Sequence, residues 1–217
     1  MEKFLGLPAE KQKNIIDAAL AAFGKMGYRK ASMNDIAIAA GISKGLVFHY
    51  FGSKKALYLY LIEFSGSILI SEMNKRFDKN ISDFFDRIRL ATEIKMSLLR
   101  MYPAILMFLG SVYYENDKEV VDNIKGILAQ SEEIRGWLAF DGMDASKFKE
   151  DIDPQLVLNI LIKFSEGYAG GSPKAVELDF DALLGEFEAC LNLMKNNFYK
   201  EEFLNERECE CECPSGN

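Results

Sequence analysis

The chain has 217 residues, of which 49% are hydrophobic, so it can bury a sizeable core without disulfide or metal staples. Its net charge of −7 is unevenly spread: residues 1–60 hold nine basic and four acidic side chains, whereas residues 61–217 hold 17 basic and 29 acidic ones. A basic module on an acidic body predicts that only the N-terminal part meets a polyanion, although a chance imbalance of surface charge would give the same totals.

The same totals exclude other classes. The longest apolar run, at about residues 104–109, is far shorter than the ~20 residues of a membrane helix, and the first residues lack the regions of a signal peptide. Cys190 stands alone, and Cys209, Cys211 and Cys213 lie close together near the C-terminus, a pattern that fits free thiols better than a disulfide framework. We therefore expect a cytoplasmic protein that does not enter a membrane.

The first 50 residues have the pattern of a helix-turn-helix. An apolar stripe with helical period runs through residues 9–26, and Gly27 stands where a C-cap glycine would. Ser32 has the position of an N-cap for a helix of about two turns. Gly41 ends that helix, and Ser43 can cap the next short one. Helix, tight glycine turn and helix thus follow one another within 20 residues.

The remaining segments are also helical in pattern, and no segment longer than four residues alternates as a strand would. Ser53 can cap a long helix, and Pro and Asn-Asp or Asp-Gly pairs supply later boundaries. The sequence predicts an all-α fold of about nine helices. We expect three parts: a helix-turn-helix domain at residues 1–55, joined through the long helix to a larger ligand-binding and dimerisation domain at 56–204, and a flexible Cys-rich tail at 205–217.

In a helix-turn-helix the second helix lies in the major groove, so it needs one face for packing and another for DNA. Val47 and Phe51, four residues apart, are expected to face inward. Lys44 can then reach a guanine edge or a phosphate, Gly45 lets the helix approach the bases closely, and Leu46 can meet a thymine methyl.

The flanking polar residues suit the DNA backbone. Ser32 and Ser43 begin helices, where backbone N–H groups can hold phosphates. Tyr50 and Lys54 are placed to grip the neighbouring backbone, and His49, the single histidine of the chain, becomes a phosphate contact beside the recognition face. The DNA-binding set is therefore Ser32, Ser43, Lys44, Gly45, Leu46, Phe48, His49, Tyr50 and Lys54.

The alternative is an interior helix pair in which Phe48 and Tyr50 are ordinary core aromatics. Burying the lysines and the histidine around them would cost several kcal/mol without partners, which favours DNA binding.

Residues 13–62 resemble the N-terminal domain of TetR/AcrR-type transcriptional regulators. The resemblance rests on the A-x-x-A-G-I-S turn, the K-G-x-x-x-H-Y-F helix and the S-K-x-A-L start, in that order and spacing. It implies a homodimer on near-palindromic double-stranded DNA, and repression released by a small molecule in the C-terminal domain. By position it also implies backbone contacts from Ser32, Ser43, Tyr50 and Lys54 and an approach to the bases by Lys44, Gly45 and Leu46. Phe48 stands where the family often has tyrosine.

Two apolar stripes in the acidic body are candidates for the four-helix dimer interface that the resemblance implies. They could instead serve only the core of one chain. The candidate interface residues are Leu156, Ile160, Phe164, Phe180, Leu184, Phe187, Leu191 and Met194.

Methionines and aromatic residues in the body could line a partly apolar inducer pocket, with Glu115 or Glu166 as a polar anchor. Apolar side chains at helical spacing are more often core, and that alternative remains open. The candidate pocket residues are Met101, Tyr102, Met107, Phe108, Tyr113, Tyr114, Trp137, Phe164 and Glu166.

We expect no enzyme, no cofactor and no metal site. Ser43 and His49 are six residues apart, about 240° around a helix, which does not suit a nucleophile and its base. No phosphate-binding loop or metal-ligand spacing occurs. The Cys209, Cys211 and Cys213 tail could bind a soft metal or sense oxidants, but a reduced, frayed tail is the simpler interpretation. A further alternative is a protein-interaction or small-molecule-binding module that reuses the fold without specific DNA binding.

Overall fold

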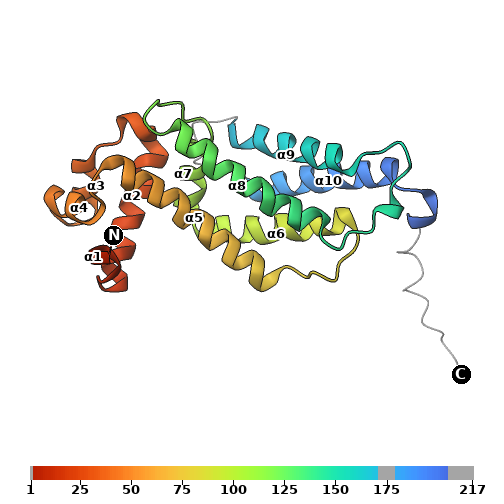
Figure 1. Ribbon diagram of the computed structural model, residues 1–217, viewed down its shortest axis with the longest axis horizontal. Coiled ribbons are helices and arrows are strands. Elements are labelled where there is room, and N and C mark those ends of the chain that lie inside the picture. The colour runs from red at the N-terminus through yellow and green to blue at the C-terminus, as the bar shows by residue number, and fades with distance from the viewer. Residues whose placement is uncertain (1, 171–178, 205–217) are drawn as a thin grey trace, which may run out of the picture.

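The computed structural model describes residues 2–170 and 179–204, apart from the side chains of residues 166, 168–170 and 180. Within these ranges the fold is entirely helical, as predicted, and has ten α-helices (Figure 1). Their bounds are α1 Glu2–Leu5, α2 Ala9–Lys30, α3 Met33–Ala39, α4 Lys44–Phe51, α5 Lys54–Arg76, α6 Phe84–Met101, α7 Pro103–Tyr113, α8 Val121–Phe140, α9 Pro154–Gly170 and α10 Phe180–Phe198.

Helices α1 to α4 form one end of an elongated molecule, and α6 to α10 form the rest (Figure 1). Serines begin three of the helices as expected: the hydroxyl oxygens of Ser32, Ser43 and Ser53 accept backbone N–H groups of α3, α4 and α5. Gly41, at φ +68°, makes the turn between α3 and α4. The predicted helix-turn-helix is therefore present.

Helix α2 differs from its predicted end. Gly27 adopts a positive φ, +69°, which glycine tolerates, but one more helical turn follows, to Lys30. The buried side chain of Tyr28 accounts for that extra turn, because its ring stacks on Phe23 with centroids 6.4 Å apart and meets Tyr58 at 5.0 Å. Residues 28–30 thus form a kinked extension that leads into α3.

Helix α1 was not expected from the sequence. Its Phe4 is fully buried, with ring centroids 4.8 Å from Phe51, 5.7 Å from Tyr60 and 6.3 Å from Tyr50. The signal was the apolar pair before Gly6 and Pro8, which is too short to show a helical period. Because Phe4 packs against the C-terminal end of α4, α1 belongs to the helix-turn-helix domain.

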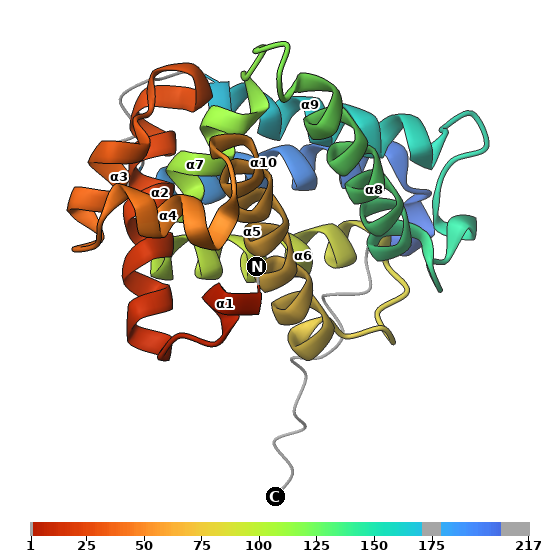
Figure 2. The ribbon, with the colours of Figure 1, turned by 60° about the vertical axis from the view of Figure 1, so that its left-hand side comes forward.

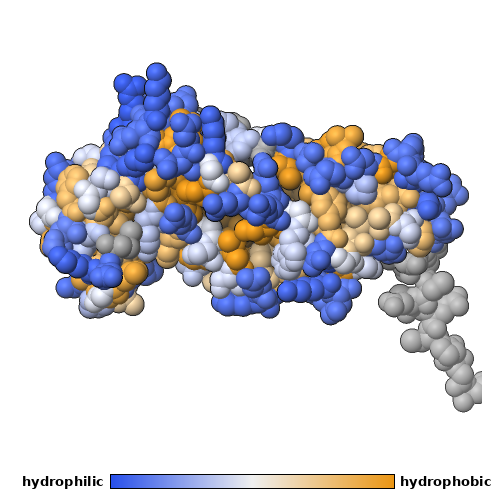
Figure 3. Space-filling model, in the orientation of Figure 1, coloured by the Kyte–Doolittle hydropathy of each residue, from blue (hydrophilic) through white to orange (hydrophobic). Residues whose placement is uncertain are grey.

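Helix α5 links the two parts of the molecule. Its first half packs Leu57, Tyr58 and Leu61 into the core of the helix-turn-helix domain, and its second half runs beside α6 (Figures 1 and 2). By length and composition it is apolar enough to cross a membrane, a test that core helices of water-soluble proteins also pass. On the face drawn in Figure 3, apolar areas over the body alternate with hydrophilic ones.

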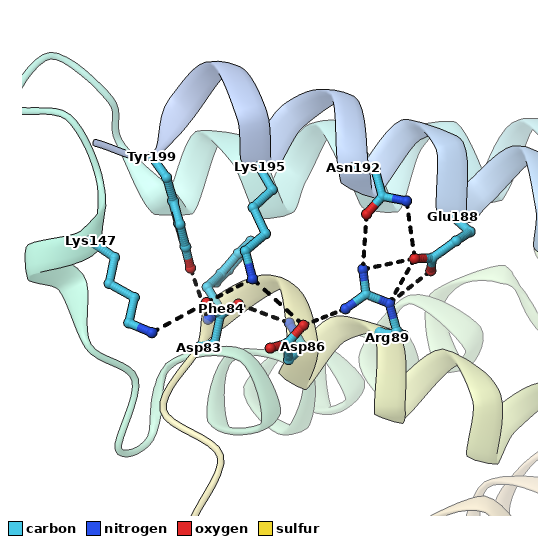
Figure 4. A network of polar contacts seen from close by, with 9 residues as sticks. All are labelled: Asp83, Phe84, Asp86, Arg89, Lys147, Glu188, Asn192, Lys195 and Tyr199. Carbon is cyan, nitrogen blue, oxygen red and sulfur yellow. Dashed lines mark hydrogen bonds and ion pairs between the residues drawn. The ribbon is translucent and has the colours of Figure 1, made fainter. Parts of the chain in front are cut away.

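The body is held together by an apolar core and by a polar network between α6 and α10 (Figure 4). In that network Asp83, the N-cap of α6, accepts hydrogen bonds from Lys195 at 3.0 Å and Lys147 at 3.4 Å. The hydroxyl of Tyr199 accepts the backbone N–H of Phe84 at 3.1 Å. These contacts fix the C-terminal end of α10 against the start of α6.

Candidate nucleic-acid interface

Helix α4 has two faces of opposite character. Val47 and Phe51 are buried against α3 and α5, as their spacing predicted. The residues predicted to face DNA lie on the other side: Lys44, Gly45, Leu46, Phe48 and His49 are exposed, and Tyr50 is half-buried. A short helix that exposes leucine, phenylalanine and histidine to solvent presents a contact surface, because the fold itself makes little use of these side chains.

The serines that cap α3 and α4 each keep a hydroxyl hydrogen that can be donated. The Ser32 oxygen accepts the backbone N–H groups of Asn34 and Asp35 at 3.2 and 3.4 Å. The Ser43 oxygen accepts the N–H of Leu46 at 3.2 Å. Since each hydroxyl acts as an acceptor in its cap, its hydrogen remains available to donate to an anion such as a phosphate. Both helix starts therefore suit the backbone contacts assigned to them.

The exposed aromatic ring of Phe48 has a second use. The Lys44 ammonium lies 5.9 Å from the centre of that ring, within the range of a cation–π contact. The ring of His49 meets that of Tyr50 edge-on at 5.7 Å. Aromatic neighbours thus limit the orientations of the cation and of the imidazole on the exposed face.

Lys54 makes contacts within the helix-turn-helix domain. Its ammonium donates to the backbone oxygen of Arg29 at 3.1 Å and stands 4.8 Å from the centre of the Tyr28 ring. These contacts tie the start of α5 to the kinked end of α2. An ammonium has three donors, so the remaining ones can still reach a phosphate.

A contact between the two parts of the chain fixes the same segment from the other side. The carboxylate of Glu115, in the loop after α7, accepts the backbone N–H of Tyr28 at 2.8 Å. Nearby, α2 crosses α7 so closely that a Cβ on Gly24 would lie 3.0 Å from the backbone nitrogen of Phe108. The sequence did not predict these contacts between the two parts, because they join residues more than 80 positions apart. Their one signal in the sequence was a glycine in the middle of a helix.

Among the described residues, the predicted pocket residues lie partly in the core and partly at the surface. Phe108 is packed in the core, 5.3 Å from the ring of Tyr58, while Met101, at 70% exposed, lies at the surface. Tyr102, Tyr113 and Tyr114 are also exposed. Helical periodicity marks the buried side of a helix without telling a packed core from a cavity, and this is why the set is dispersed.

The other members of that set also have separate places. Trp137 packs on Phe77, with ring centroids 6.1 Å apart, and Met107 lies against Gly24. Phe164 stacks on Phe187 of α10. Glu166 falls outside the described side chains.

The predicted dimer residues divide into two groups. Leu156, at 57% exposed, and Ile160 lie at the surface of α9. Leu191 is fully buried within one chain, and Leu184 and Phe187 line a cleft beside α6. The cause is the packing of α10 on α6.

The other side of α10 exposes Leu193, at 65%, which was not in the predicted set. Met194 is partly buried in the body's core. The side chain of Phe180 and the cysteines at 209, 211 and 213 lie outside the part of the chain that the structure describes.

The helix-turn-helix domain matches a known protein family. Residues 15–61 match the family described as "Bacterial regulatory proteins, tetR family". The helix-turn-helix domain is a TetR-family domain. Its match covers α2, α3, α4 and the start of α5, the elements that build the exposed face described above.

Two curated HTH-type transcriptional regulators extend the comparison. The regulator BetI of Agrobacterium fabrum is 43% identical over 58 residues, which are 27% of this chain and 28% of that protein. The regulator RutR of Escherichia coli is 25% identical over 169 residues, 76% of each chain. The stronger similarity thus covers less than a third of either chain, and this chain matches less than two thirds of BetI.

The whole fold also has known counterparts. The crystal structure of FadR from Bacillus subtilis in complex with stearoyl-CoA superposes with a TM-score of 0.67 over 82% of this chain and 96% of that one, at 20% sequence identity. The chain therefore has the all-α fold of this FadR, and its helix-turn-helix domain carries the TetR-family match.

Proposed function

We propose that the protein is a transcriptional repressor that acts in the cytoplasm, binds a near-palindromic DNA site as a homodimer, and is released by a small molecule bound in its second domain. The observation that carries the proposal is the exposed face of α4 behind two serine-capped helix starts. In this arrangement Lys44, Gly45 and Leu46 approach base edges, and Ser32, Ser43, His49, Tyr50 and Lys54 contact the backbone.

Two features support the dimer and the ligand. Leu156, Ile160 and Leu193 expose large apolar side chains on α9 and α10, which a second copy would cover. FadR of Bacillus subtilis, which shares the fold, was crystallised with stearoyl-CoA, so this architecture accommodates a ligand in that protein.

The decisive experiment is selection of random duplex DNA by the purified protein at two salt concentrations. We expect a near-palindromic site whose affinity falls steeply with salt, because lysines that neutralise phosphates release counterions. Binding that is absent or insensitive to salt would contradict the proposal and favour an interaction module that reuses the fold. Sedimentation should give a dimer at micromolar concentration, and a monomer there would contradict the paired half-sites.

A further inference from the structure

A cleft of about 500 Å³ lies between α6 and α10, far from the DNA-binding face. This volume is within the range of small-molecule sites, about 300 to 1,000 Å³. The α10 wall is apolar: Leu191 is fully buried at the base, Leu184 lies along the side, and the ring of Phe187 is backed by that of Phe164 at 6.3 Å. The cleft can therefore hold an apolar or aromatic body.

The cation in this cleft is already neutralised. The Nε atom of Arg89 donates to both carboxylate oxygens of Glu188, at 2.9 and 2.8 Å (Figure 4). Its other nitrogens bind Asp86 and, at 3.3 Å, Asn192. The hydrogen bond to Glu188 raises the pKa of Arg89 despite the opposing effect of burial. An arginine with its donors occupied in this way has little capacity to attract an anionic ligand.

A carboxylate in the same cleft has no such partner. Glu93 lies one turn after Arg89 on α6, lines the cleft and is exposed. It makes no hydrogen bond or ion pair with any described residue. With Arg89 and Glu188 cancelling each other, the lining carries one uncompensated negative charge, and it also includes the aromatic ring of Phe187, which can attract a cation.

We propose that the cleft binds a lipophilic cation. Its apolar body packs on Leu184, Phe187 and Leu191, and its positive charge lies at Glu93. Binding to the cleft does not depend on the proposed function. Only the effect of binding on DNA affinity rests on it. Helix α6 meets α7 at an angle of 112° at Pro103, and α7 packs on α2 at Gly24, so a displacement of α6 reaches the helix-turn-helix domain through rigid contacts.

The test compares two ions of nearly the same size and shape but opposite charge, tetraphenylphosphonium and tetraphenylborate, by calorimetric titration of the full chain. We expect the phosphonium to bind and the borate to bind at least about tenfold more weakly. Glu93→Gln should weaken phosphonium binding about tenfold, whereas Glu133→Gln, on the exposed side of α8, should leave it unchanged. Equal affinity for the two ions, or an unchanged affinity of Glu93→Gln, would overturn the proposal.

A second variant closes the cleft without disturbing the fold. A Cβ placed on Gly185 meets no atom within 4 Å, so Gly185→Leu has room for its side chain inside the cleft. We expect this variant to keep its thermal midpoint or raise it, since leucine is the better helix former, and to lose phosphonium binding. Retained binding would overturn the location of the site.

The same titrations separate this inference from the proposed function. Phosphonium that binds with the expected variant effects but leaves DNA affinity unchanged supports the cleft and contradicts release of DNA by this ligand. A protein that selects a palindrome and binds neither ion supports the regulator and overturns the cleft.

Discussion

The carboxylate of Glu115 accepts the backbone N–H of Tyr28 at 2.8 Å, across 87 residues of sequence. That N–H is presented because Gly27, at φ +69°, interrupts the regular path of α2. The other oxygen of Glu115 accepts the N–H groups of Asn116 and Asp117, both at 3.0 Å. One side chain thus joins the body to the segment that leads into α3.

Glu115→Ala should lower the free energy of unfolding by about 1–3 kcal/mol, because it leaves a half-buried backbone donor without its charged acceptor. Glu115→Gln keeps an oxygen acceptor and should lose less. Urea denaturation measures both changes, with Glu132→Ala on the exposed side of α8 as the control. We also expect weaker DNA binding by Glu115→Ala, since Ser32 follows the released segment. A loss no larger than that of the control would show that the contact is dispensable.

Alanine at Gly24 and alanine at Gly126 should change the stability of the protein in opposite directions. In α2 a Cβ on Gly24 would lie 3.0 Å from the backbone nitrogen of Phe108 and 3.2 Å from the Cβ of Met107. Gly24→Ala should therefore destabilise the protein by about 1–3 kcal/mol through overpacking, although alanine favours helices. Gly126→Ala in α8, where a Cβ meets nothing within 4 Å, should stabilise it by about 0.5–1 kcal/mol. Thermal unfolding of both variants measures this difference, and shifts of the same sign would contradict the close α2–α7 contact.

The helix-turn-helix could be predicted because its signals are local. Ser32 and Ser43 cap helices within three residues of themselves, Gly41 makes its turn with its own φ, and Val47 and Phe51 show their burial by spacing alone. Each of these effects is decided within about one helical turn, so a single sequence contains the information.

The body could be predicted as helical but not in its packing. The stripe that includes Leu191 was compatible with a partner subunit and with the core of one chain, and in the structure Leu191 is buried within the chain. The same holds for Phe108, which fills the core beside Tyr58. Which apolar face meets which depends on interhelical geometry, which the pattern along one helix does not contain. The cleft at Glu93 could not be predicted for the same reason.

The Asp83 network predicts how stability depends on pH. Burial disfavours the charged carboxylate, but hydrogen bonds from Lys195 and the Asp86 N–H, and the charges of Lys195 and Lys147, hold the pKa of Asp83 below its ordinary value. The folded protein therefore binds this proton more weakly than the unfolded chain does. The stabilisation is complete above the ordinary pKa of about 4 and is lost as the pH falls below it.

Asp83→Asn should cost about 2–4 kcal/mol at pH 7, because it removes the carboxylate charge that faces two largely buried ammonium groups. Its further loss of stability between about pH 5 and 3 should be smaller than that of the unaltered protein, since the titrating group is gone. Denaturation at several pH values measures both effects. Asp151→Asn, at an exposed turn, is the control, and an unaltered acid dependence in Asp83→Asn would assign the effect to other carboxylates.

Lys44 is exposed at the start of α4. The salt dependence of DNA binding distinguishes a contact of Lys44 with a phosphate from a contact with a guanine edge. If Lys44 contacts a phosphate, Lys44→Ala should weaken binding about equally for all sequences and reduce the salt slope by about one per subunit. If it contacts a guanine edge, the loss of about 1–3 kcal/mol should be confined to sites that keep that base. Titrations of the selected DNA and of single-base variants at two salt concentrations measure both outcomes.

The control for Lys44 is Lys75→Ala, since Lys75 pairs with Glu72 on the far half of α5. Phe48→Leu removes the ring that faces the Lys44 ammonium and should shift binding in the same direction by a smaller amount, because an exposed cation–π contact contributes about 0.5–1 kcal/mol. If Lys44→Ala binds DNA as well as Lys75→Ala does, Lys44 does not contact DNA. Substitutions of Ser43 and His49 then test whether the rest of the exposed face of α4 contacts DNA.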